Sequence, residues 1–217
     1  MISIRVFDRN SATDMHCAEY LAAYRMWHDV WRETYEQLGF GSILYSDGFT
    51  RQEQVLGIFI DGKCAGLSCY RTVDLASEPG RSDSWLADWP SDLMDELSAQ
   101  DPLLLIGSAF AIAKEFRRQE HLGFTFKDLL AAANVRYFER HTGHYGMLGS
   151  MRNSRGTNTA VYKYGVTKLR TIAINKEPTD LVIFLRDKLK PLPDEIDFMF
   201  RRAWIPGTKA EPLRRAG

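Results

Sequence analysis

The sequence predicts an α/β domain with a mixed, mostly antiparallel twisted sheet of about six to seven strands flanked by helices. Two apolar runs, residues 54–60 and 63–73, flank Asp61-Gly62, a dipeptide typical of tight antiparallel hairpins. A third apolar run, Leu103–Ala113, precedes a helical pattern over residues 126–140 and a further strand at 143–149. A strand, a helix and a strand in this order predict a parallel pair, so the sheet is mixed.

Other segments complete this pattern. Residues Ile2–Phe7 alternate as a strand does, and Cys17–Leu38 reads as a long amphipathic helix that Gly39 ends. The buried face of this helix is aromatic, and it either packs in the core or lines a pocket for an apolar substrate. Further expected elements are a loop and short helix at 76–101, whose role stays open, a short helix at 158–164, and strands at 169–174 and 180–185. We expect one domain over 1–190 and a partly mobile C-terminal extension over 191–217.

Composition narrows the functional classes. Lys plus Arg and Asp plus Glu both number 28 in 217 residues, so no overall field attracts nucleic acid. No apolar run is long enough to span a membrane and no signal peptide is recognisable, so we expect a cytoplasmic protein. The three cysteines have no metal-ligand spacing, and His141 and His144 lack further ligands, so we expect no metal site. The oligomeric state stays open.

The segment from Leu103 to Thr125 carries the main functional signal. Its apolar strand leads into a basic loop, Lys114-Glu-Phe-Arg-Arg-Gln-Glu-His-Leu-Gly123, and then into a helix. Thr125 and Asp128 have the spacing of a capping box at the start of this helix. Free N–H groups and the helix dipole favour an anion at such a place. The segment therefore predicts a site for a phosphorylated ligand.

This organisation resembles the GNAT superfamily of acyl-CoA N-acyltransferases, over about residues 2–187. The resemblance implies that main-chain groups of Phe110, Ala111 and Ile112 pair with the pantetheine arm of an acyl-CoA or acyl carrier protein cosubstrate.

The pyrophosphate loop of the family, R/Q-x-x-G-x-G/A, is altered in this sequence. Gly123 is present, Thr125 replaces the second small residue, and Glu120 stands where the family has Arg or Gln. Two alternatives follow: either the loop is longer and Arg117, Arg118 or Gln119 anchors the phosphates, or tight CoA binding is lost.

The run Asn158-Thr-Ala-Val-Tyr-Lys-Tyr-Gly165 resembles the Asn…Ala…Tyr-x-x-x-Gly segment of the family in shortened form. The resemblance implies a cofactor contact for Asn158 and a tyrosine general acid towards the departing thiolate. Tyr162 and Tyr164 compete for that role, and both could instead simply pack.

A narrower resemblance concerns long-chain N-acyl amino acid synthases and acyl-homoserine-lactone synthases. The aromatic helix, the polar connection to Asp47 and the hairpin leading into Gly66-x-x-x-x-Arg71 carry it. It implies a long acyl chain, donated by CoA or by acyl carrier protein, and an amine acceptor such as an amino acid.

Acyl transfer to an amine also needs a group that removes a proton, for which Glu33 and Glu115 are candidates. The main hypothesis is therefore an N-acyltransferase acting on a primary amine. The alternative is a non-catalytic module of the same fold that binds an acyl carrier, a partner protein or a small metabolite.

Overall fold

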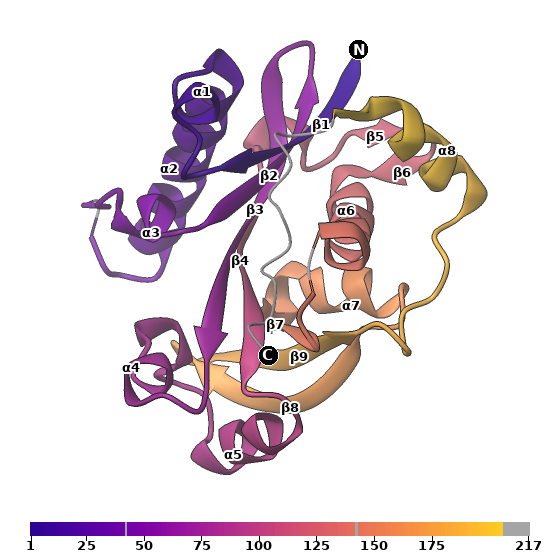
Figure 1. Ribbon diagram of the computed structural model, residues 1–217. Coiled ribbons are helices and arrows are strands. Elements are labelled where there is room, and N and C mark those ends of the chain that lie inside the picture. The colour runs from indigo at the N-terminus through magenta and orange to yellow at the C-terminus, as the bar shows by residue number, and fades with distance from the viewer. Residues whose placement is uncertain (42, 142, 206–217) are drawn as a thin grey trace.

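The computed structural model describes residues 1–41, 43–141 and 143–205. Its centre is an eight-stranded sheet in the order β10-β1-β2-β3-β4-β7-β9-β8 (Figure 1). The strands are β1 (Ile2–Asp8), β2 (Gln54–Ile60), β3 (Lys63–Asp74), β4 (Leu103–Ile112), β7 (Gly146–Arg152), β8 (Thr167–Ile174), β9 (Glu177–Leu185) and β10 (Trp204–Ile205). Neighbouring strands are antiparallel except for the parallel pairs β1–β10 and β4–β7. The predicted mixed α/β fold is confirmed.

Helices cover both faces of the sheet. In Figure 1, the helices of the first half of the chain lie on one side of it and the later helices on the other. The first group is α1 (Ala12–Met15), α2 (Ala18–Gln37), α3 (Asp47–Thr50), α4 (Glu78–Arg81) and α5 (Ser91–Gln100), and the second is α6 (Phe126–His141), α7 (Thr157–Tyr162) and α8 (Asp194–Ala203). Short 3-10 turns are η1 (Ser84–Leu86), η2 (Lys114–Phe116) and η3 (Asn153–Arg155).

Local signals explain the elements that were predicted well. Asp61 and Gly62 both take positive φ, 48° and 79°, as the tight turn between β2 and β3 requires. Gly39 has φ 79° just beyond the end of α2, where a left-handed residue ends a helix. The Thr125 hydroxyl accepts the Asp128 N–H at 3.1 Å, so the predicted cap of α6 is present.

The sheet has more strands than expected, because β10 forms after the last predicted strand. The segment from Pro191, expected to begin an extension, contains α8, whose buried Ile196 and Phe200 join the main core. β10 then pairs with β1 in register Ile4↔Trp204. The rest of the expected, partly mobile extension, residues 206–217, lies outside the described residues. The strand expected at 143–149 begins later, at Gly146.

Residues 76–101 pack against the sheet. Leu86, Trp89, Leu93 and Leu97 are buried in a second apolar cluster with Ile106, Leu148 and neighbouring strand residues. Arg71 on β3 forms an ion pair with Asp83, and the Arg71 Nε donates to the second Asp83 oxygen at 3.2 Å. This segment is thus part of the fold, fixed by its own core and by ion pairs of Asp83 with Arg71 and of Asp92 with Arg170 on β8. No helix in the described part of the chain combines the length and apolarity of a membrane span.

Candidate active site

β4 and β7 part near the middle of the sheet. They pair only at Leu105↔Met147 and Ile106↔Leu148. Beyond this point β4 continues along β3 as far as Ile112, and β7 continues along β9 as far as Arg152. Residues 107–110 are half-buried, whereas the three residues before them are buried. The edge of β4 from residue 107 to 112 therefore has no described strand beside it.

A bulge shapes this open edge. The register of β4 against β3 shifts between Leu67↔Ala111 and Cys69↔Ser108, and Ala109 takes a φ of 53°. The Ala113 N–H donates to the Ala65 carbonyl at 3.0 Å. Because antiparallel pairs alternate, Ala111 then directs its main-chain groups to Leu67, and Ile112 directs its own away from β3.

The three residues expected to pair with a pantetheine arm therefore differ in where their main-chain groups point. Phe110 lies in the bulge, and the outward carbonyl of Ile112 accepts from Arg117 Nε at 3.2 Å.

The connection from β4 to α6 contains strands of its own. A small antiparallel hairpin, β5 (Glu120–His121) and β6 (Phe124–Thr125), lies between η2 and the helix. Leu122 and Gly123 form its turn with φ 53° and 77°. The positive φ favours glycine at position 123. Lack of space is not the reason, since a Cβ there would meet nothing within 4 Å.

The cations of this connection differ in their partners. Glu33 on α2 lies 3.8 Å from Lys114 Nζ and 3.4 Å from an Arg117 nitrogen. Gln119 Nε2 donates to the Glu115 carbonyl at 2.8 Å. Arg118 is exposed and makes no hydrogen bond or ion pair within residues 1–41, 43–141 and 143–205. It is the cation best available to a phosphate.

The first turn of α6 already carries a carboxylate. Asp128 accepts from the Thr125 hydroxyl at 2.8 Å and from Lys163 Nζ at 2.6 Å. The Asp128 carboxylate already interacts with the positive end of the helix dipole, so an incoming anion would compete with it for that charge.

Two cations near the ends of β4 and β7 were missed by the sequence reasoning. Arg155 donates to Gln37 Oε1 at 2.7 Å, which links η3 to the end of α2. Lys127 Nζ lies 3.4 Å from the Arg155 carbonyl, which links the start of α6 to η3. The arginines in the predicted polar loop 152–156 were the available signal, but their distance from Gln37 in the chain hid the contact.

The two candidate tyrosines face different neighbours. The Tyr162 hydroxyl donates to Asp180 Oδ2 at 2.7 Å, and burial together with this carboxylate raises the pKa of Tyr162. The Tyr164 hydroxyl donates to the Asp128 carbonyl at 3.3 Å, and burial raises its pKa to about 12. Asn158 Nδ2 also donates to Asp180 Oδ2, at 3.0 Å. Asp180 thus joins Asn158 and Tyr162, but not Tyr164.

Sequence reasoning missed Asp180. The one signal was a carboxylate directly before the apolar run Leu181–Leu185, in a strand that is otherwise buried.

The aromatic face of α2 packs inside. Tyr20, Tyr24 and Trp27 each have ring centroids within 5.5 Å of Phe49 on α3. A groove of about 430 Å³ beside α2 is lined by none of these rings, but by charged residues such as Arg25, Glu33 and Glu115 together with apolar ones such as Met26 and Val30. These rings therefore pack in the core, which is the first of the two interpretations given for this helix.

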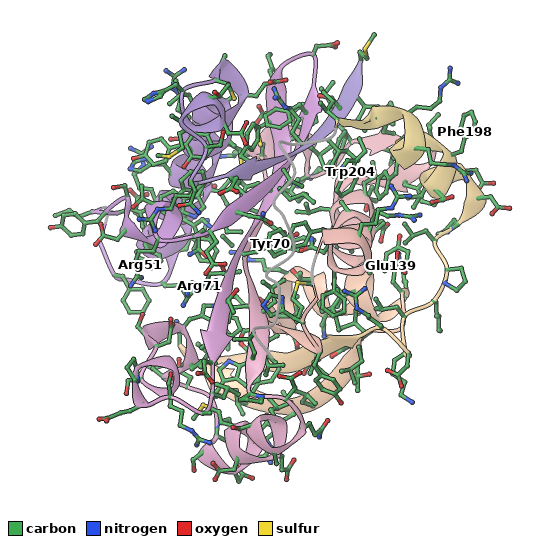
Figure 2. All side chains as sticks on the ribbon, in the orientation of Figure 1. Arg51, Tyr70, Arg71, Glu139, Phe198 and Trp204 are labelled. Carbon is green, nitrogen blue, oxygen red and sulfur yellow. The ribbon has the colours of Figure 1, made fainter. Side chains whose placement is uncertain are left out.

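Figure 2 labels Tyr70 and Arg71, which are consecutive on β3 and point to opposite faces of the sheet. Tyr70 donates to Asn134 Oδ1 on α6 at 2.8 Å, and Arg71 pairs with Asp83 near η1. The sheet that contains β4 and β7 thus lies between α6 on one face and η1 on the other.

Solved structures share this fold. The CoA-dependent acyl-homoserine lactone synthase BjaI, solved with MTA, matches with a TM-score of 0.57 and 14% identity over 96% of each chain. The chain has the GNAT fold. The N-acyl amino acid synthase FeeM from uncultured soil microbes matches with a TM-score of 0.54 and 15% identity, over 87% of this chain and 92% of FeeM.

The aminoglycoside acetyltransferase AAC(6')-Ib, in complex with acetyl-CoA and an aminoglycoside, matches this GNAT fold with a TM-score of 0.51 and 15% identity. The match covers 86% of this chain and 95% of that one. No family model and no curated protein matches the sequence.

Proposed function

We propose that this protein is an N-acyltransferase that moves an acyl group from a thioester to a primary amine. The observation that carries the proposal is the open edge of β4 beyond Ile106. A pantetheine arm is an extended chain with amide groups, and it can add to an unpaired strand edge as a peptide does. The outward N–H of Ile112 is suited to such pairing, whereas its carbonyl already accepts from Arg117 Nε.

The phosphate of the donor would lie at the β4–α6 connection. Arg118 is free to bind it, with the first N–H groups of α6 and the nearby Lys127 as further donors. Acyl-CoA and acyl carrier protein share this phosphopantetheine, so either is a candidate donor.

We favour a longer acyl chain over acetyl. A Cβ on Gly107 would lie 3.2 Å from Met147 Sδ, and one on Gly149 would lie 2.8 Å from Met151 Cε. Two methionine side chains therefore fill the space beside glycines on β4 and β7. Methionine adapts its shape at low cost, so an acyl chain could displace these side chains.

The chemistry needs little from side chains. The amine attacks the thioester carbonyl, an amide forms and the thiol leaves. An outward N–H on the β4 edge can stabilise the oxyanion, and holding both substrates together supplies much of the rate. Glu33 and Glu115 remain the candidate bases, directly or through water, although the ion pairs of Glu33 with Lys114 and Arg117 compete for its carboxylate. The acceptor we propose is an amino acid.

The same ion pairs favour the second candidate function. Glu33 already neutralises two of the cations that a phosphate would use. A protein with this arrangement could hold an acyl carrier weakly and transfer nothing.

The test is transfer with defined donors. The protein would be mixed with acetyl-CoA, a long-chain acyl-CoA or the matching acyl carrier protein, each with a panel of amino acids and other primary amines. Mass spectrometry would detect the amide, and a thiol reagent would detect the released carrier. Stoichiometric amide and thiol support the proposal. Donor binding without any amide supports the binding module instead, and neither binding nor amide contradicts both.

A further inference from the structure

The indole N–H of Trp31 is a buried hydrogen-bond donor without an acceptor. Trp31 lies on α2, and its ring packs against the main core. Its Nε1 atom is buried, and no group in the described ranges 1–41, 43–141 and 143–205 accepts from it. The Tyr35 ring stands edge-to-face beside it, with centroids 6.3 Å apart, but a ring is a weaker acceptor than an oxygen. Buried donors without an acceptor cost free energy and are rare, so this one is a candidate for a bond to a ligand.

The turn of α2 before Trp31 is linked to the bulge of β4. A Cβ on Gly48 would lie 3.1 Å from the Trp27 ring. The Gly48 carbonyl accepts from Gln52 Nε2 at 2.8 Å, and Gln52 Oε1 accepts from the Ser108 hydroxyl at 3.3 Å. Ser108 stands at the start of the bulge, on the open edge. A short chain of contacts thus joins the turn of Trp27 to this edge.

The turn of α2 after Trp31 is linked to the end of β7. Gln37 Oε1 accepts from Arg155 at 2.7 Å, and η3, which contains Arg155, follows β7 directly. Burial lowers the pKa of Arg152, the last residue of β7, and the nearby Tyr35 is among the groups that oppose this shift. The end of α2 therefore lies beside the end of β7.

Trp31 lies between these two turns. Trp27, Trp31 and Tyr35 follow each other at intervals of four residues, so they share one face of α2. The strands β4 and β7 part beyond Ile106 and Leu148. Because this face of α2 is linked first to β4 and then to β7, the Trp31 ring lies on the α2 side of the space between the parted strands.

We propose that the Trp31 N–H donates a hydrogen bond to an amide carbonyl of the pantetheine arm and so holds the donor against the open edge of β4. This rests on the proposed function, in which the arm extends along residues 107–112. An indole N–H only donates, so it selects an oxygen of the ligand and not an amide N–H or an ammonium group.

The place of Trp31 along the strand favours the arm over the other parts of the donor. The proposed phosphate site is at Arg118, beyond the end of β4, and the proposed acyl site is beside Gly107. Trp31 comes after the turn of α2 that is linked to the bulge, and two residues before Glu33, which lies 3.8 Å from Lys114 Nζ. Its N–H is therefore beside the middle of the arm.

Indole N–H signals in NMR spectra test the proposal without turnover. The five tryptophans give five such signals, and the Trp31 signal is assigned in wild type through its backbone. Coenzyme A carries the whole arm, and adenosine 3′,5′-bisphosphate, which has the phosphates and the base but no arm, is the matched control. We expect coenzyme A to shift the Trp31 N–H proton downfield, as a new hydrogen bond does, and the bisphosphate to leave it in place.

The Trp31→Phe variant keeps an aromatic ring and loses the N–H. Loss of one neutral hydrogen bond should raise the dissociation constant for coenzyme A by about 2- to 12-fold. The dissociation constant for the bisphosphate should not change, and calorimetry measures both. An equal change for the two ligands would mean that Trp31 acts only through packing, which overturns the proposal.

The binding measurements separate this proposal from the proposed function. If coenzyme A binds wild type and the Trp31 signal stays in place, the proposal is overturned while the proposed function stands. A signal that moves equally with the bisphosphate, or only with an added amino acid, also overturns it. If neither coenzyme A, a long-chain acyl-CoA nor the acyl carrier protein binds, the proposed function fails, and the role of Trp31 fails with it.

Discussion

Ile106 of β4 and Leu148 of β7 form the last pair between two parallel strands that then part. Every prediction about the donor depends on this relationship, because it leaves the edge of residues 107–112 that faces away from β3 without a described strand beside it. The side chains of Ile106 and Leu148 lie in the second apolar cluster, so the point of parting is anchored on the core that residues 76–101 complete.

Arg118 should contribute to donor binding. Loss of a charge-assisted phosphate contact costs about 1.5–3 kcal/mol, so Arg118→Ala should weaken donor binding by about 10- to 100-fold. Calorimetric titration with acyl-CoA measures this. Unchanged affinity in Arg118→Ala would mean that the phosphate does not bind at this connection.

Glu33 should restrain the neighbouring cations. Glu33→Gln removes the charge that pairs with Lys114 and Arg117, so both cations become free for a phosphate. We expect the dissociation constant for acyl-CoA to fall by several-fold, by about 0.5–1 kcal/mol. A weaker complex in this variant would mean that Glu33 itself supports binding.

Ala109 should tolerate glycine but not valine. Its φ of 53° is in the left-handed region, which costs an L-residue about 1–2 kcal/mol and costs a β-branched residue more. Ala109→Gly should leave the free energy of unfolding within about 1 kcal/mol of wild type, and Ala109→Val should lower it by about 1–3 kcal/mol. Urea unfolding of both variants decides this. Equal stabilities would show that the bulge relaxes.

The fold was largely predictable because its strongest signals are local. The Asp61-Gly62 turn, Gly39 after α2 and the Thr125 cap act within a few residues, and each is where the sequence placed it. β10 depends on pairing with β1, which lies at the other end of the chain, and α8 lies within the Pro- and Arg-rich segment after Pro191 that looked irregular. Local patterns carry neither relationship.

The candidate site was less predictable for the same reason. The residues that hold Tyr162 and Asn158 include Asp180 and Thr171, which come from two later strands. The ion pairs of Glu33 join α2 to a connection more than seventy residues further along, and no spacing rule links them. The roles of the predicted site residues stay predictions.

Thr125 should stabilise α6. Its hydroxyl accepts the Asp128 N–H and donates to the Asp128 carboxylate. Thr125→Ala should lower the free energy of unfolding by about 0.5–2 kcal/mol, and Thr125→Ser should retain most of it. Thermal unfolding of the two variants is the measurement, and an equal loss in both would mean that the methyl group, not the hydroxyl, carries the effect.

Asp180 should make the protein sensitive to acid. Its pKa in the fold is depressed, so the stability it contributes is present above the unfolded pKa of about 3.9 and is lost as pH falls through the lower folded value. Between about pH 5 and pH 2, wild type should lose more stability than Asp180→Asn, which has no carboxylate to protonate. Urea unfolding across this range gives both slopes, and parallel slopes would contradict the contribution of Asp180.

The central claim is that a donor thioester lies along the open edge of β4. Amide hydrogen exchange, followed by mass spectrometry with and without a long-chain acyl-CoA, tests it most directly. The account predicts that the donor slows exchange in peptides covering residues 107–118, with no comparable change in peptides of β8. Donor binding that leaves residues 107–118 exchanging at their original rate would contradict the account.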